Sequence, residues 1–278
     1  MEEKIQKYYL TQLHIFEKDF AALKKDYDEE AIHKMRVSIK RLRALFLFLE
    51  YIEPVQFNSK KELKLVRRIF KLTGKIRDVQ IQKGIIGGIR DTLDLEVPDL
   101  LRYLQKNEQK AINEFRENIG GIIKKAPLID SKKVTGLIKG LSDNQEVAIR
   151  TIRLLNEKIS RIDLLRKDLE NIRDVHEIRI HLKQIHYLFD FTQDYFSRKL
   201  FLKMPLKRLK RIETIYGEWH DRVNVISMLN LFFKETGRQE DPKYKLLYKR
   251  VMTEKEMLHE QIRYIMRSEL LFQFVLEI

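Results

Sequence analysis

The chain has 278 residues, of which 44% are hydrophobic and 35% are charged, with only 10 Gly and 5 Pro; this composition favours an all-α architecture of long helices around buried cores. Because 55 Lys and Arg residues outnumber 41 Asp and Glu residues, the formal net charge is +14, and we expect an anionic partner: nucleic acid, an acidic membrane surface or an inorganic polyanion. The absence of cysteine excludes disulfides and thiolate metal sites and is compatible with a reducing cytosol.

Apolar residues recur three and four positions apart in long segments separated by short breaks. This pattern predicts eight helices, at residues 2–26, 29–53, 59–93, 98–125, 142–169, 172–197, 204–236 and 242–276. The first, which begins "MEEKIQKYYL", is interrupted by charges every few residues and so lacks the apolar core of a signal peptide. No window approaches the roughly 20 apolar residues of a membrane span. We therefore expect a cytoplasmic protein without membrane association.

The second predicted helix carries the basic segment "IHKMRVSIKRLR" at residues 32–43. At about 100° per residue, its apolar residues face a bundle core on one side, and its basic residues form a separate narrow stripe. Like charges at this spacing repel by a few tenths of a kcal/mol per pair, so the stripe indicates either a solvated face or a bound polyanion. The stripe contains His33, Arg36, Lys40 and Arg43, and the core face contains Met35, Ile39, Leu42, Phe46 and Leu49.

The third predicted helix continues this pattern. Lys64, Arg67 and Lys71 form a second helical row of basic residues. Adjacent antiparallel helices joined by short loops pack side by side, so both basic rows are expected to border one groove. The opposite side of the third helix carries Leu63, Val66, Ile69 and Phe70, which we interpret as core residues.

A segment in the middle of the chain, "KAPLIDSKKVTGLIKGLSDN", contains turn-forming residues that weaken any long helix. We place a boundary there, between a four-helix bundle at 1–128 and a second at 140–278. A constant offset of 143 residues relates the two parts, which predicts a tandem repeat with a pseudo-twofold axis. The matched pairs are His33 and His176, Arg36 and Arg179, Lys40 and Lys183, Gly74 and Gly217, and Asp78 and Asp221.

The second copy of the basic segment reads "VHEIRIHLKQIH" at residues 175–186. It repeats the stripe with His176, Arg179, Lys183 and His186, and it repeats the core face with Ile178, Leu182, Ile185 and Phe189. The next helix supplies Lys207, Lys210 and Arg211. Seeing the same stripe twice favours the bound polyanion over the solvated face.

At these residues the sequence resembles the CHAD family, the conserved histidine α-helical domain. The family motif, roughly H-x-x-R-x-x-x-[KR]-x-x-[RK], is matched by "HKMRVSIKRLR" and, except at its last position, by "HEIRIHLKQIH", and family-like segments "LTGKIRDVQ" and "IYGEWHDRVNV" follow. The resemblance covers nearly the whole chain. It implies two four-helix bundles whose basic helices line a central groove or pore that binds inorganic polyphosphate. At position 186 a histidine stands where the motif has Arg or Lys, so a permanent charge is not expected there.

The resemblance thus implies a non-enzymatic polyphosphate-binding module, without cofactor or metal, that directs proteins to polyphosphate granules or condenses the polymer. Oligomeric state is left open, as is whether His33 and His176 contact the ligand or orient the helices. The expected binding residues are His33, Arg36, Lys40, Arg43, Lys64, Arg67, Lys71, His176, Arg179, Lys183, His186, Lys207, Lys210 and Arg211.

Two alternatives compete with this interpretation. A nucleic-acid-binding helical protein shares the net charge, but proteins that grip single strands interleave aromatic residues with basic ones, and here the aromatic residues fall near apolar faces. A metal-dependent phosphohydrolase would use a pair such as His220 and Asp221, although the first copy has Arg77 at the matching position. No Walker loop, nucleophile motif or paired-carboxylate signature supports an enzyme.

Overall fold

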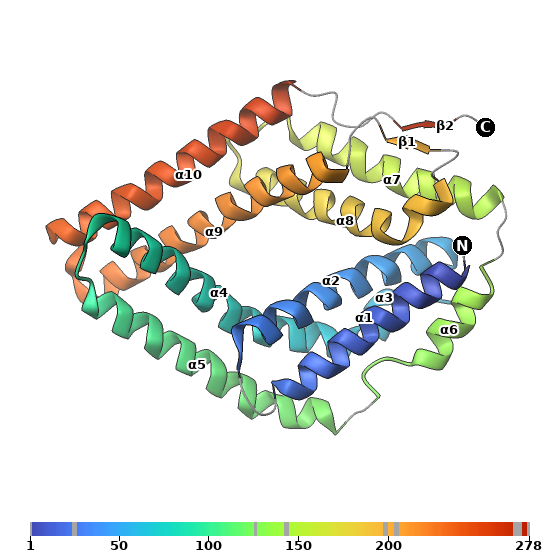
Figure 1. Ribbon diagram of the computed structural model, residues 1–278, viewed down its shortest axis with the longest axis horizontal. Coiled ribbons are helices and arrows are strands. Elements are labelled where there is room, and N and C mark those ends of the chain that lie inside the picture. The colour runs from blue at the N-terminus through green and yellow to red at the C-terminus, as the bar shows by residue number, and fades with distance from the viewer. Residues whose placement is uncertain are drawn as a thin grey trace. The chain divides into compact units, whose positions relative to one another are not determined.

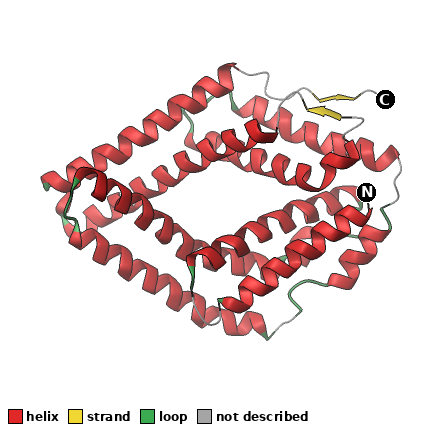
Figure 2. Cartoon of the chain, viewed as in Figure 1, coloured by secondary structure: helices red, strands yellow, loops and turns green. Residues whose placement is uncertain are grey.

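A computed structural model describes residues 2–23, 27–124, 127–141, 145–196, 200–202, 206–268 and 274–276. These residues form ten α-helices, one short 3₁₀ helix and two three-residue strands (Figures 1 and 2). The predicted all-α class is therefore confirmed. Within the described residues, none of the helices combines the length and the apolar character that crossing a bilayer requires.

The helices follow the predicted order, with two additions. They are α1 (Glu2–Ala22), α2 (Glu29–Ile52), α3 (Ser59–Glu62), α4 (Lys64–Leu93), α5 (Pro98–Ile123), α6 (Ser131–Lys139), α7 (Gln145–Leu165), α8 (Ile172–Phe196), α9 (Leu206–Thr236) and α10 (Pro242–Ser268). The 3₁₀ helix η1 (Arg238–Glu240) lies between α9 and α10, and strands β1 (Leu200–Leu202) and β2 (Phe274–Leu276) pair in antiparallel register.

Two predicted helix ranges were wrong. The helix predicted at 59–93 is divided at Leu63 into α3 and α4. The helix predicted at 242–276 ends at Ser268, and residues 274–276 form β2. The central segment, where no long helix was expected, contains the nine-residue α6. The Asp130 side chain caps it by accepting a hydrogen bond from the backbone N–H of Lys133 at 3.1 Å, an arrangement that stabilises a helix start.

The chain divides into two compact units. Unit 1 comprises Met1–Lys71, Ile119–Lys210 and Leu270–Ile278, and unit 2 comprises Leu72–Asn118 and Arg211–Glu269. Each unit combines segments from both predicted halves, 1–128 and 140–278. The two halves describe the repeat in the sequence. That each half forms a separate four-helix bundle stays a prediction.

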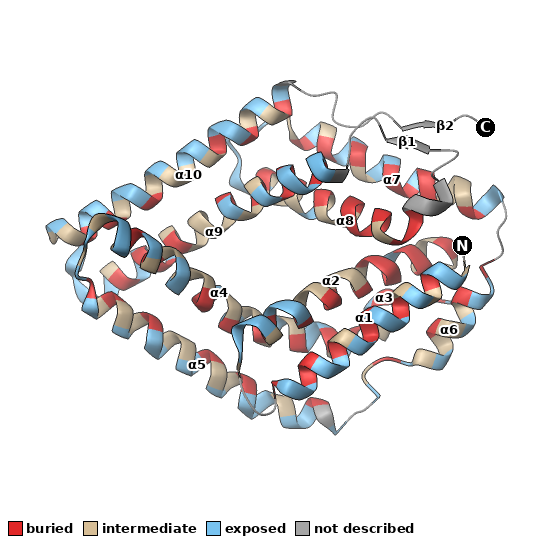
Figure 3. Cartoon of the chain, viewed as in Figure 1, coloured by how far each residue is buried: buried red, intermediate tan, exposed pale blue. Residues whose placement is uncertain are grey.

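In unit 1, α1 packs along α2 and α7 packs along α8, while α2 also contacts α7 and α8. The predicted core face of α2 is confirmed, because Met35, Ile39, Leu42, Phe46 and Leu49 are fully buried. The predicted core face of α8 is likewise buried. Figure 3 shows buried and exposed residues alternating along the helices, as expected for amphipathic segments.

Equivalent positions of the repeat meet where α2 contacts α8. The rings of Phe48 and Phe191, which are related by the offset of 143 residues, have their centroids 5.4 Å apart. The ring centroid of Tyr8 on α1 also lies 5.1 Å from that of Phe191. A contact between equivalent positions is what a twofold axis produces, so this contact is consistent with the pseudo-twofold. Symmetry over the rest of the chain stays a prediction.

In unit 2, the C-terminal part of α4 forms a second core with α5, α9 and α10. Phe232 of α9 is fully buried in this core, and its ring centroid lies 5.4 Å from that of Tyr103 and 5.3 Å from that of Tyr244. The single tryptophan, Trp219, is fully buried against His259, with ring centroids 5.8 Å apart. Gly237 ends α9 with a φ of 67°, in the left-handed region that favours glycine.

Candidate polyanion-binding site

Unit 1 contains all of the predicted ligand-binding residues except Arg211, which belongs to unit 2. The candidate site can therefore be described within unit 1. Its members lie on α2, on the first two turns of α4, on α8 and on the first turn of α9.

Two arginines of the α2 stripe lie over the ring of Phe70 on α4. The guanidinium carbon of Arg36 is 4.0 Å from the ring centroid, and Nη1 of Arg36 donates a hydrogen bond to the Phe70 carbonyl oxygen at 2.5 Å. The guanidinium carbon of Arg43 is 5.4 Å from the same centroid. Stacking on an aromatic face stabilises a guanidinium while its remaining N–H groups stay able to donate. The interpretation of Phe70 as a core residue needs correction, because its ring is partly exposed and supports these arginines.

Arg43 lies in a strongly cationic environment. Burial, and then the neighbouring charge of Arg67, lower the pKa of the Arg43 guanidinium, although an arginine stays protonated under ordinary conditions. Among the residues that the structure describes, no carboxylate forms an ion pair with Arg43 or with Arg67. An anion placed between them would relieve their mutual repulsion.

The basic row at the start of α4 is exposed. Lys64, Arg67 and Lys71 point away from the core, while Val66 and Ile69 on the opposite side of the helix are fully buried. Within the described part of the chain, none of the three cations forms an ion pair.

Farther along α4, in unit 2, the lysines are neutralised. Lys75 lies 2.6 Å from a carboxylate oxygen of Glu114, and Lys83 lies 2.8 Å from one of Glu108. The basic row on the first turns of α4 therefore keeps its charge without a paired carboxylate among the described residues, whereas Lys75 and Lys83 are paired with carboxylates of α5.

The stripe on α8 is partly accessible. His176, Arg179 and Lys183 are partly exposed, as are Arg36, Lys40 and Arg43 in the first copy, whereas His33 is exposed. On α9, the remaining predicted residues Lys207, Lys210 and Arg211 are exposed.

His186 is buried at the contact between α2 and α8, with 9% of its surface exposed. Its ring stacks on Tyr187 with centroids 5.4 Å apart, and its Nε2 lies 3.6 Å from an oxygen of Asp190. The other oxygen of Asp190 lies 3.4 Å from Nε of Arg41 on α2. The role of His186 in ligand binding stays a prediction, and its burial leaves little surface for a ligand. Arg41 and Asp190 link α2 and α8, the two motif helices, which carry the two copies of the family-like motif. The sequence analysis did not single out these two residues.

The two motif helices approach each other toward their C-terminal ends (Figure 1). On α2, the residues nearest to α8 include Arg41 and Phe48. At about 100° per residue these lie within roughly 80° of His33 around the helix axis, so the basic stripe borders the side of α2 that contacts α8. The equivalent positions on α8 have the same relation to its stripe.

A metal centre was considered at His220 and Asp221 of α9. Nδ1 of His220 lies 3.2 Å from the side-chain nitrogen of Asn224 and 3.9 Å from an oxygen of Asp221. No group of three metal-ligating side chains is found among the described residues.

Comparison with known proteins identifies similar folds and a family. Solved structures with a similar fold include the CHAD domain from the plant Ricinus communis, with a TM-score of 0.69, 15% sequence identity and coverage of 99% of this chain and 94% of that one. They also include PptA from Streptomyces chartreusis, with a TM-score of 0.62, 11% identity and coverage of 97% and 99%. No curated protein matches the sequence. The model of the CHAD domain family matches residues 8–230, and the chain belongs to this family.

Proposed function

We propose that the chain binds inorganic polyphosphate on the basic surface of unit 1 formed by α2, the first turns of α4, α8 and the start of α9. One observation carries the proposal. Arg36 and Arg43 are held over Phe70 beside Lys64, Arg67 and Lys71, and no described carboxylate pairs with Arg43 or with the α4 row. Such a concentration of cations is unfavourable in the free protein, because like charges repel, and an extended polyanion reverses the sign of that term.

The chemistry of these side chains suits phosphate. Guanidinium groups donate to phosphate oxygens in pairs, and lysines add mobile point charges. Polyphosphate has no bases, so its recognition needs no stacking surface. The ring of Phe70, already covered by Arg36, can keep its supporting role while the ligand is bound.

The second motif helix extends the surface. A twofold relation through Phe48 and Phe191 would place the two stripes on equivalent sides of α2 and α8. His176, Arg179 and Lys183 would then contact the same polymer as His33, Arg36 and Lys40. Thr214 and Glu218 replace Lys71 and Lys75 of the first copy, so we expect the first copy to contribute more of the affinity.

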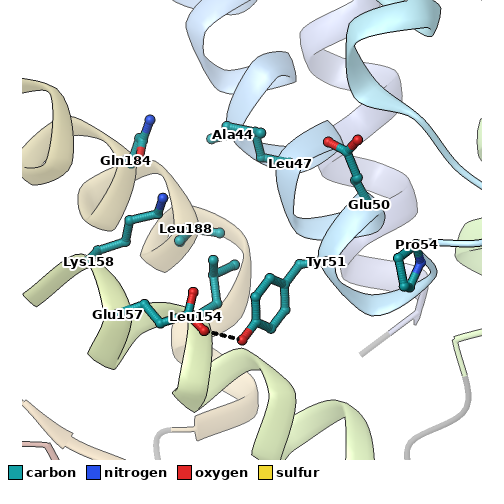
Figure 4. Close-up of a pocket in the computed structure, with 10 residues that line it drawn as sticks. All are labelled: Ala44, Leu47, Glu50, Tyr51, Pro54, Leu154, Glu157, Lys158, Gln184 and Leu188. Carbon is teal, nitrogen blue, oxygen red and sulfur yellow. Dashed lines mark hydrogen bonds between the residues drawn. The ribbon is translucent and has the colours of Figure 1, made fainter. Parts of the chain in front are cut away.

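Nucleic acid is a weaker candidate for the same surface. Phe46 and Phe48 are fully buried, and the hydroxyl of Tyr51 donates to Glu157 at 2.6 Å (Figure 4). Base stacking on aromatic side chains supplies much of the affinity of single-strand binders, and these rings are already occupied. We therefore treat nucleic acid as a secondary partner.

We further propose a non-enzymatic role in which the chain directs an attached or associated protein to polyphosphate granules in the cytoplasm, or condenses the polymer. This role needs neither a cofactor nor a metal.

A polyphosphate titration at several salt concentrations, with single-stranded DNA, ATP and orthophosphate as competitors, tests the proposal. We expect the affinity to fall steeply as salt rises, because binding releases counterions, and we expect polyphosphate to resist displacement at equal phosphate concentration. Displacement by short single-stranded DNA would refute specificity for polyphosphate. Phosphate release in the presence of a divalent metal, lost in His220→Ala, would instead favour a phosphohydrolase.

A further inference from the structure

The basic row on α4 has a natural next member. α4 is one continuous helix from Lys64 to Leu93, and at about 100° per residue Lys75 falls within about 40° of Lys71, one turn farther along. Lys75 therefore has the position that a fourth member of the row, after Lys64, Arg67 and Lys71, would occupy. What separates it from those three residues is its partner.

The partner of Lys75 is a carboxylate of the neighbouring helix. Nζ of Lys75 donates to both side-chain oxygens of Glu114 on α5, at 2.6 and 2.7 Å, and both residues belong to unit 2. Figure 1 shows α5 running alongside α4 in this unit. The pair has no net charge, so Lys75 adds little to the attraction of α4 for a polyanion. A polyanion that recruited Lys75 would have to break the pair and would leave the Glu114 carboxylate beside its own phosphates, where like charges repel.

The next turn of α4 and the second copy of the repeat agree with this picture. Asp78 is exposed and lies within about 20° of Lys71 around the helix axis, so an acid follows the basic row on the same side of the helix. In the second copy, the exposed Glu218 stands at the position equivalent to Lys75. In the described structure neither copy presents an unpaired cation at this position, because the first pairs its lysine with Glu114 and the second carries an acid.

We propose, on the basis of the polyphosphate binding proposed above, that Glu114 determines how far polyphosphate extends along α4. By holding Lys75, Glu114 ends the binding surface at Lys71. The limit is electrostatic, so releasing Lys75 lengthens the surface by one cation. The limit also fixes how many phosphates α4 neutralises, however long the polymer is.

Glu114→Gln tests this limit, because it nearly keeps the size of the side chain and removes the charge that holds Lys75. The pair is exposed, with 50% and 37% of the two side chains accessible, so breaking it should leave the fold intact. We expect the slope of log affinity against log salt to become steeper by about 0.7, the contribution of one more neutralised phosphate. Between about 50 and 200 mM salt, the variant should therefore lose about 2.5-fold more affinity than the wild type does. Fluorescence anisotropy with end-labelled polyphosphate of defined length measures both slopes.

Two other variants of α5 control for the change in net charge. Glu117 is exposed, lies three residues after Glu114 and forms no ion pair among the described residues, so Glu117→Gln changes the net charge equally but releases no cation. Glu108→Gln releases Lys83, which Glu108 holds at 2.8 Å. Lys83 lies about 120° from Lys71 around the axis of α4, off the basic row. Both controls should bind with the wild-type slope.

A double variant shows whether the gain passes through Lys75. Adding Lys75→Gln to Glu114→Gln removes the released cation and restores the wild-type net charge. The double variant should therefore return to the wild-type slope.

A wild-type slope in Glu114→Gln, with polyphosphate binding by the wild type intact, would overturn the limit while leaving the proposed function standing. An equally steep slope in Glu117→Gln would also overturn it, since total charge would then explain the gain. So would a gain that persists in the double variant. Failure of the wild type to bind polyphosphate would reject the proposed function and the limit together.

Discussion

Replacing the three exposed cations of α4 by glutamine is the strongest test of the basic surface. Lys64, Arg67 and Lys71 form no ion pair among the described residues and point away from the core. Their removal should therefore leave the fold intact while lowering the charge that faces the ligand. Circular dichroism and the midpoint of urea unfolding check that the triple variant is folded.

The expected magnitude follows from the number of contacts. For a flexible polyanion each neutralised phosphate contributes about 0.7 to the slope of log affinity against log salt, so losing three contacts should reduce that slope by about 2. Over a fourfold rise in salt, from about 50 to 200 mM, the wild type should then lose about 20-fold more affinity than the triple variant does. Fluorescence anisotropy with end-labelled polyphosphate of defined length measures both slopes.

A control of equal net charge separates local contacts from the overall field. Lys18 on α1 and Lys132 and Lys139 on α6 are exposed cations of unit 1 outside the proposed site. Replacing these three by glutamine changes the net charge as much as the test variant does. If the control reduces the slope equally, total charge governs binding and the assignment to α4 is wrong.

Three further predictions concern stability and pH. Arg36→Met removes the hydrogen bond to the Phe70 carbonyl and the stacking on its ring, and it should lower the free energy of unfolding by about 1–3 kcal/mol in urea denaturation. Phe48 is fully buried beside Phe191, so Phe48→Ala opens a cavity there and should lower the free energy of unfolding by about 3–5 kcal/mol in the same assay. Burial above all lowers the pKa of His181 below its ordinary value of 6.5, so the unfolded chain binds the proton more readily and stability falls as pH drops below about 6.5; His181→Gln should lose stability less steeply over that range.

Each of these predictions has a result that contradicts it. Wild-type stability in Arg36→Met would mean that the guanidinium is not held by Phe70. A cost below about 1 kcal/mol in Phe48→Ala would argue against the buried contact between equivalent positions. Parallel pH curves for His181→Gln and the wild type would show that this histidine is not the group that titrates.

Amphipathic periodicity was sufficient to predict the core faces of the motif helices. Met35, Ile39 and Leu42 are buried, and the basic stripe of α2 lies on a separate side, because helix geometry fixes which residues share a face. The repeat also predicted that equivalent positions would be related, and Phe48 meets Phe191. Helix boundaries were less predictable: α6 is stabilised by burying Val134 and Ile138, and composition alone did not reveal that packing.

The candidate site divides in the same way. The positions of the cations along each helix follow from the sequence, because charged residues on one side of a helix cannot all enter a core. Which of these cations are neutralised by a carboxylate could not be predicted from the sequence. Lys71 and Lys75 lie four residues apart on α4, yet among the described residues only Lys75 meets a carboxylate, that of Glu114, which lies 39 residues farther along the chain.

The sequence by itself determined the all-α class, the repeat and the identity of the basic stripes, since these depend on local periodicity and residue type. Only the tertiary structure decided that Phe70 supports Arg36, that His186 is buried beside Asp190, and that Glu114 holds Lys75. The physical reason is that burial and pairing depend on neighbours distant in the chain, and helical periodicity carries no information about which neighbour a given face will meet.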